Sequence, residues 1–229
     1  MHIYLFLSYL VYERTLTNIL SLPVAVGGLC NGTYLEMGAL NGVRFSNTYV
    51  FNKVLGWNGV LVELGPQNFA ALQKNRPNEI ANVHAGVCGE KKTLHYVEKP
   101  AQPAVGGIWE FSSPSFRDQW WKGIKLEDTP TIQCEPLKDI LEKHATNTTY
   151  FDFFSLDIEG AELEALFSLD YSRVGFGIIF VEADGHNKRK NNALRTFLEQ
   201  QGYTFLWSVG RSDWFINNNF HSIYEDLIH

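Results

Sequence analysis

The sequence of 229 residues has little excess charge of either sign, since 19 Lys and Arg stand against 25 Asp and Glu and the net charge is −6 at pH 7. No basic excess is available to neutralise phosphates, which argues against a nucleic-acid partner. Cysteine is also scarce. Cys30, Cys88 and Cys134 show no metal-ligand spacing, and an odd number of cysteines cannot all pair within the chain. We interpret them as buried thiols.

A hydrophobic run long enough to cross a membrane is missing too. The apolar stretch 3–12 is about ten residues long and lacks a basic segment before it, whereas a spanning helix needs about 20. We expect residues 1–30 to form an apolar, helical extension; a truncated signal or anchor is the alternative, and membrane association would require the anchor. The compartment stays open between the cytoplasm and the secretory-pathway lumen, where sequons at Asn31 and Asn147 would permit glycosylation.

The remaining composition is that of a folded α/β protein. Hydrophobic residues make up 45% and aromatic residues 14% of the chain, which excludes intrinsic disorder. Short apolar runs alternate with segments of helical period, a pattern that predicts a parallel sheet. The expected strands are 33–37, 59–64, 81–87, 150–157 and 177–182, followed by an antiparallel hairpin of 203–208 and 213–217. The expected helices are 46–55, 67–75, 136–144, 161–169 and 188–201.

We expect one domain over 31–229, interrupted by a long aromatic-rich loop at 98–135. This segment holds four of the eight prolines together with Trp109, Trp120 and Trp121. Loops of that length inside a compact domain are usually functional. We therefore interpret it as a candidate lid whose tryptophans stack on an acceptor; packing of the loop onto the domain is the alternative.

A glycine-containing turn follows the first expected strand, and an acid ends the second. Gly38 and Gly42 allow the backbone to turn tightly and to approach a ligand. Their G-x-x-x-G spacing departs from the dinucleotide fingerprint G-x-G-x-x-G. Glu63 lies at the tip of the adjacent strand, where a carboxylate can accept two hydrogen bonds from a ribose diol.

In these segments the chain resembles the FkbM-type methyltransferases. The resemblance extends from about Asn31 to Ile216, and it is most specific in two blocks, one around the glycine turn and one around the fourth strand. The matching runs are 32–43, 46–48, 55–63, 75–77, 152–162 and 179–182.

The resemblance implies a Rossmann-like class I methyltransferase fold, with a mostly parallel seven-stranded sheet, helices on both faces and a closing antiparallel hairpin. It also implies S-adenosyl-L-methionine as cofactor and a hydroxyl oxygen as the usual methyl acceptor. Glu36, Gly38 and Ala39 would line the methionine part of the cofactor, and Glu63 would hold the ribose. The expected cofactor site is completed by Asn41, Gly42, Ser46 and Asp157.

Several carboxylates gather at the end of the fourth strand. Asp157 and Glu159 are two residues apart, and Glu162 follows on the first helical turn. In one interpretation Glu159 or Glu162 caps the helix; in another Asp157 orients or deprotonates an acceptor hydroxyl. A third interpretation has a divalent metal shared by Asp157 and Glu182, but the sequence offers no His or Asn set to complete it, so no metal site is predicted.

His186, after the fifth strand, is the second catalytic candidate, since its ring titrates near neutral pH; a solvated loop histidine is the alternative. The sequence thus predicts an O-methyltransferase that acts on a glycan or a small hydroxylated metabolite. An inactive methyltransferase-like binding module and a nucleotide-dependent oxidoreductase are the competing hypotheses. The oxidoreductase is disfavoured by the glycine spacing.

Overall fold

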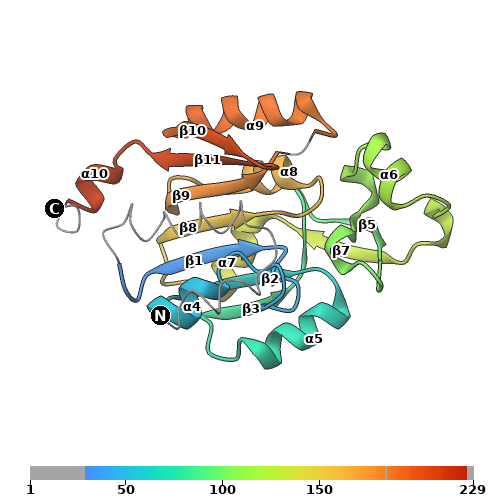
Figure 1. The fold of residues 1–229 in the computed structure, drawn as a ribbon, viewed down its shortest axis with the longest axis horizontal. Helices are drawn as coiled ribbons and strands as arrows, with labels where there is room; N and C mark the ends of the chain where they lie inside the picture. Colours follow the sequence, from blue (N-terminus) through green and yellow to red (C-terminus); the bar gives the residue numbers. More distant parts are fainter. Residues whose placement is uncertain (1–28, 184, 226–229) are drawn as a thin grey trace, which may run out of the picture.

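The computed structural model describes residues 29–183 and 185–225. Its main sheet has seven strands in the order β10-β11-β9-β8-β1-β2-β3 (Figure 1). The five strands from β9 to β3 are parallel, and β11 runs antiparallel to both β9 and β10. The strands are β1 (Thr33–Met37), β2 (Asn58–Glu63), β3 (Ala81–His84), β8 (Tyr150–Leu156), β9 (Gly175–Glu182), β10 (Tyr203–Val209) and β11 (Ser212–Asn217). The predicted α/β class and closing hairpin are confirmed.

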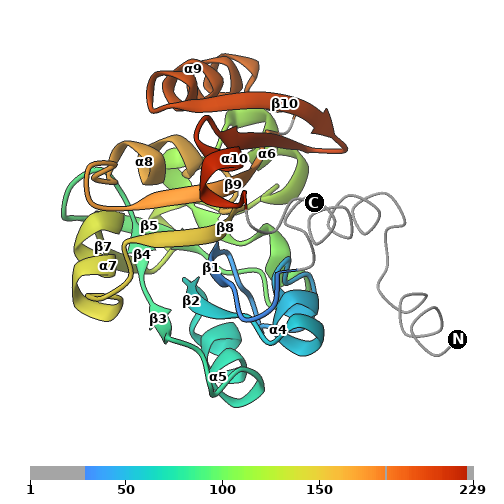
Figure 2. The ribbon, with the colours of Figure 1, turned by 90° about the vertical axis from the view of Figure 1, so that its left-hand side faces the viewer.

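Helices cover both faces of this sheet, as predicted (Figure 2). One face packs against α7 (Leu137–His144), α8 (Glu162–Phe167) and α9 (Lys188–Gln200). The other packs against α4 (Tyr49–Leu55), α5 (Pro66–Asn75) and α10 (Phe220–Ile223).

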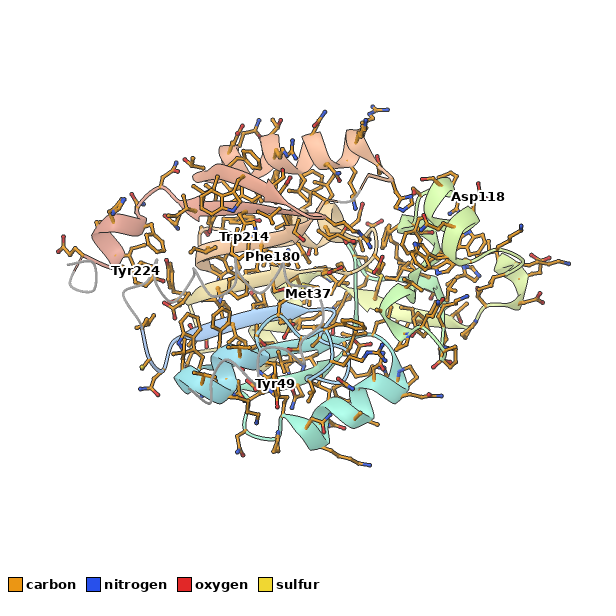
Figure 3. All side chains as sticks on the ribbon, viewed as in Figure 1. Met37, Tyr49, Asp118, Phe180, Trp214 and Tyr224 are labelled. Atoms are coloured by element: carbon orange, nitrogen blue, oxygen red, sulfur yellow. A yellow bond between two sulfur atoms is a disulfide. The ribbon has the colours of Figure 1, made fainter. Side chains whose placement is uncertain are left out.

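The central strands β8 and β9 are buried on both sides, which explains their nearly unbroken apolar sequence. Figure 3 shows the side chains of Met37, Phe180 and Trp214 lying along the sheet. The aromatic residues of these strands therefore serve the core, and all of the following are buried: Phe151, Phe153, Phe154, Phe176 and Phe180.

A second, smaller sheet lies beyond the carboxyl ends of the parallel strands (Figure 1). It has the order β4-β7-β5-β6 and is built from β4 (Gly86–Val87), β5 (Lys92–Val97), β6 (Gly107–Ile108) and β7 (Thr131–Glu135). The prediction of one strand over 81–87 is wrong, because the chain leaves β3 after His84 and Gly86 pairs with Cys134 of β7. The prediction of a continuous loop over 98–135 is wrong as well.

The segment 98–135 contains regular structure with its own small core. Helix α6 (Pro114–Trp120) begins at Ser113, whose side chain accepts the N–H of Phe116, and two buried side chains, Phe116 and Trp121, pack beside Val97. The Trp121 indole donates to the Val105 carbonyl at 2.7 Å. Packing therefore explains Trp121, while Trp109 and Trp120 stay partly exposed.

A disulfide joins Cys88 to Cys134 and fastens the end of β4 to β7. The prediction of buried thiols is thus wrong for these two residues, and Cys30 is exposed rather than buried. Spacing along the sequence gave no indication of the pair, since 46 positions separate the two cysteines and only the pairing of β4 with β7 brings them together.

Reduction of the disulfide is expected to destabilise the protein by about 4 kcal/mol, because a loop of this length gains that much conformational freedom in the unfolded state. Urea unfolding with and without a reductant measures the difference. Cys88→Ser should reproduce it, whereas Cys30→Ser should leave the midpoint in place. If the reductant lowers the free energy of unfolding of Cys88→Ser as much as that of wild type, the destabilisation does not come from the disulfide.

No helix among the described residues is long and apolar enough to cross a membrane. The predicted apolar, helical extension over residues 1–30 lies almost entirely outside the described part of the chain.

Candidate active site

The glycine turn after β1 is shaped by its backbone. Gly38 and Gly42 have φ values of +80° and +73°, the left-handed region that favours glycine. A Cβ on Gly38 would lie 1.9 Å from the Asp157 carbonyl, and one on Gly42 would meet Leu72 and Arg76. The turn therefore lies directly against the end of β8, and the expected cofactor loop and catalytic acid are adjacent.

Glu36 organises the segment that follows this turn. Its carboxylate is buried and accepts the Asn47 N–H at 2.6 Å, the Ser46 hydroxyl at 2.8 Å and the Thr48 hydroxyl at 2.5 Å. Burial raises the pKa of Glu36, and these donors oppose that rise. The side chains of Glu36 and Ser46 thus face each other inside the protein.

Asn41 and Ala39 are also used internally. The Asn41 amide oxygen accepts the N–H groups of Val43 and Arg44 at 3.1 and 2.8 Å. Ala39 is fully buried, and its N–H donates to the Val62 carbonyl of β2. Ala39 and Asn41, both predicted in the cofactor site, therefore make contacts within the protein that hold the loop in shape.

Glu63 lies at the end of β2, beside the same turn. One carboxylate oxygen accepts the Leu40 N–H at 2.8 Å, and the other accepts the Gly65 N–H at 2.7 Å and the Asn68 side-chain amide at 3.4 Å. Burial raises the pKa of Glu63, and these bonds oppose the rise. Because a carboxylate oxygen accepts two hydrogen bonds, the oxygen that accepts the Leu40 N–H retains capacity for a hydroxyl of a ligand.

Arg76, which the sequence analysis did not single out, supports the glycine turn from α5. Its buried guanidinium donates to the Gly42 carbonyl at 2.9 Å and pairs with Glu79 at 2.8 Å. A buried arginine is rare unless it is paired, but the sequence alone does not show that it is buried.

Three carboxylates meet at the ends of β8 and β9. One oxygen from each of Asp157, Glu159 and Glu182 lies within 4.8 Å of the others. The Asp157 carboxyl is hydrogen-bonded to Glu182, and burial together with the nearby Glu162 raises its pKa to about 6. Burial and the charge of Asp157 also raise the pKa of Glu182. The group therefore binds a proton far more readily than isolated carboxylates do.

Glu162 has a structural role. One of its carboxylate oxygens accepts the N–H groups of Ile158 and Gly160 at 3.1 and 3.0 Å, and the other pairs with Lys190 at 2.5 Å. These bonds hold the turn in which Glu159 adopts a φ of +56°. Both N–H partners precede α8, which has no side-chain cap, so Glu162 holds the preceding turn and the capping interpretation is wrong.

The segment 103–121, which we call the covering segment, lies over this turn. A Cβ on Gly160 would lie 2.7 Å from the Phe111 carbonyl, and one on Gly107 would lie 3.3 Å from the Glu159 Cβ. His186 reaches the same segment, because its Nδ1 lies 3.1 Å from the Ser115 hydroxyl and its ring packs edge-on against Phe116.

His186, Glu159 and Lys190 line a small cavity beneath the covering segment, together with Phe111 and Phe116. The structure therefore places His186 beside Glu159, one of the three carboxylates at the ends of β8 and β9, at the boundary between the covering segment and the rest of the domain.

The strand order, the glycine turn after β1 and the buried acid after β2 define a class I methyltransferase. The family model described as the methyltransferase FkbM domain matches residues 36–205. The chain therefore belongs to the FkbM methyltransferase family, and its cofactor is S-adenosyl-L-methionine.

No curated protein sequence matches the chain. Among solved structures it is similar to methyltransferase FkbM from Methylobacillus flagellatus KT, with 13% identity, a TM-score of 0.45 and coverage of 82% of this chain and 43% of that one. It is also similar to Aeropyrum pernix fibrillarin with bound S-adenosyl-L-methionine, with 10% identity, a TM-score of 0.47 and coverage of 90% and 74%. The METTL16 methyltransferase domain shows 13% identity, a TM-score of 0.49 and coverage of 90% and 68%.

The residues at the strand ends fit this cofactor. The glycine turn exposes backbone where a Cβ would clash, and Glu63 is a buried carboxylate with unused acceptor capacity next to it. Such an acid suits the hydroxyls of a ribose.

Proposed function

We propose that this methyltransferase transfers the methyl group to a hydroxyl oxygen of a glycan or a small hydroxylated metabolite, and that Asp157 accepts the hydroxyl proton. The observation that carries the proposal is the raised pKa of Asp157, about 6, at the strand end next to the glycine turn. A base is most useful when its pKa lies near the working pH.

S-adenosyl-L-methionine, when bound, supplies an electrophilic methyl carbon. The chain must then hold the acceptor oxygen in line and exclude water. Asp157 is half-buried and takes the proton, while Glu182 accepts or donates a hydrogen bond beside it. His186 and the partly exposed Trp109 of the covering segment orient the acceptor. The net charge of −6 favours a neutral or cationic acceptor over a nucleic acid.

A screen with tritiated S-adenosyl-L-methionine against glycans and hydroxylated metabolites tests this function. Transfer that yields an alkali-stable ether, absent in Asp157→Asn, supports it. Label found on nitrogen or carbon would overturn O-methylation, and label found on RNA would overturn the proposed acceptor class. Failure of well-folded protein to bind S-adenosylhomocysteine would favour an inactive binding module.

We further propose that Glu63 binds the ribose of the cofactor. Glu63→Ala is expected to weaken S-adenosylhomocysteine binding at least tenfold, because a charge-assisted hydrogen bond to the ribose is lost. Titration calorimetry measures the affinity, and circular dichroism checks the fold. Glu79→Ala would be a poor control because Glu79 pairs with the buried Arg76; the exposed Glu127→Ala should bind normally. Unchanged affinity in Glu63→Ala would contradict the assignment.

For the compartment, we propose the lumen of the secretory pathway. The Cys88–Cys134 disulfide supports this, since such bonds persist in oxidising compartments. The sequon residue Asn147 is exposed in a turn after α7, where a glycan is sterically tolerated. Protein from its native source should shift in mass on endoglycosidase treatment; full reduction of both cysteines there would contradict the proposal.

A further inference from the structure

Tyr96 on β5 brings the smaller sheet to the candidate ribose site. A Cβ placed on Gly65 would lie 2.9 Å from the Tyr96 hydroxyl and also 2.9 Å from a Glu63 carboxylate oxygen. Both side chains therefore end beside Gly65. Glu63 comes from the main sheet, whereas Tyr96 comes from the strand that precedes the covering segment.

The environment of this hydroxyl is unusual for a buried tyrosine. Tyr96 is 7% exposed, and burial raises its pKa, with a further rise from the charges of Glu63 and Glu98. Yet within residues 29–183 and 185–225 no group donates to the Tyr96 hydroxyl or accepts from it. The hydroxyl is not one of the fully buried polar atoms without a partner among these residues, so it is accessible from outside and available to a ligand.

Two glycines lie beside the Tyr96 hydroxyl. Gly65 and Gly106 both lack the Cβ that would approach the Tyr96 hydroxyl, at 2.9 and 3.5 Å. Glu63 is an acceptor, so a hydroxyl that donates to it has its own oxygen available as an acceptor. Tyr96 is a donor at neutral pH because its pKa is raised.

We propose that Tyr96 is a cofactor-binding residue that donates a hydrogen bond to a ribose hydroxyl held by Glu63. This proposal rests on the assignment of Glu63 to the ribose. It gives β5 a role in recognition, and it links cofactor binding to the covering segment, since β6 of that segment pairs with β5 through Tyr96 and Ile108.

Tyr96→Phe removes only the hydroxyl and tests the proposal directly. We expect S-adenosylhomocysteine to bind this variant about tenfold more weakly in titration calorimetry, with an unchanged melting temperature of the ligand-free protein. Tyr171→Phe is the matched control, because the Tyr171 hydroxyl likewise has no partner among the described residues but is fully buried, on the connection between α8 and β9. It should bind like wild type.

The 2′-deoxy and 3′-deoxy analogues of S-adenosylhomocysteine make the test specific. For the analogue that lacks the contacted hydroxyl, wild type and Tyr96→Phe should bind with equal affinity. Equal affinity of both proteins for S-adenosylhomocysteine itself would overturn the role of Tyr96, as would a tenfold loss that persists with both analogues. If wild type does not bind S-adenosylhomocysteine, the cofactor site itself is wrong.

Discussion

Asp157→Asn is expected to lower kcat at least about 100-fold and, above pH 6, to make the protein more stable than wild type. The loss of activity follows from the loss of the proton acceptor at the end of β8. The gain in stability follows from the same environment, because the ionised Asp157 is surrounded by Glu159, Glu162 and Glu182.

The sign of the stability effect comes from the raised pKa. Between the ordinary value of 3.8 and the folded value of about 6, the folded protein holds a proton that the unfolded chain releases. Stability therefore falls as the pH rises through this window and stays low above it. At about 1.4 kcal/mol per pKa unit, the ionised carboxylate costs about 3 kcal/mol, and the partial exposure of Asp157 reduces this to about 2 kcal/mol.

Two measurements test these expectations together. In wild type, kcat should rise with pH and level off above about 6, whereas Asp157→Asn should keep only a small residual rate. Thermal melting at pH 4.5 and pH 7.5 should show the variant gaining stability relative to wild type at the higher pH. Asp118→Asn, on the exposed side of α6 and remote from the sheet (Figure 3), is the control for both. A variant that loses activity without any pH-dependent gain in stability would refute the proposed ionisation.

The main sheet could be predicted from the sequence because its signals are local. Continuous apolar runs mark β8 and β9, and a proline at the first position starts α5. The smaller sheet was missed although β5 alternates between partly exposed and buried side chains, as at His95 and Tyr96. Its strands are short, and the pairing that stabilises them joins residues about 40 positions apart. Pairing between such distant residues produces only a weak pattern in the sequence of each strand.

The candidate site is likewise only partly predictable from the sequence. The positions of Glu63 and Asp157 at strand ends follow from strand prediction, because parallel strands end at one edge. The hydrogen-bond partners of the carboxylates cannot be predicted in this way. Glu36 faces the hydroxyls and N–H of the following turn, and Glu162 holds a turn through Ile158 and Gly160. Those contacts depend on how the chain folds back on itself, which residue types alone do not specify.

Arg76→Met is expected to destabilise the protein by about 3–5 kcal/mol, because it leaves buried carboxylates without their counter-charge. The side chains of Arg76 and Glu79 are 0% and 1% exposed. Glu79 also accepts the Tyr34 hydroxyl at 2.6 Å and the Gly59 N–H at 2.9 Å, so it cannot move toward water without breaking the start of β2. Glu36 lies close enough for its charge to act on Arg76 as well.

Urea unfolding measures this loss, and Arg44→Met is the control, since Arg44 is exposed on the same turn and rests on the Phe45 ring. Arg76→Lys should fold more readily than Arg76→Met, because it keeps the charge but lacks the fork that reaches Glu79 and Gly42 together. A loss below about 1 kcal/mol in Arg76→Met would show that the buried charges are not compensated by Arg76.

The lysine variant separates stability from binding. Two buried groups hold the glycine turn: Glu63 through the Leu40 N–H and Arg76 through the Gly42 carbonyl. If the turn binds the cofactor through its backbone, as the internal use of its side chains implies, then loosening Gly42 must weaken S-adenosylhomocysteine binding. Arg76→Lys should therefore lose affinity under conditions where it is fully folded, although Arg76 lies beneath the turn and its contacts are made with the protein itself.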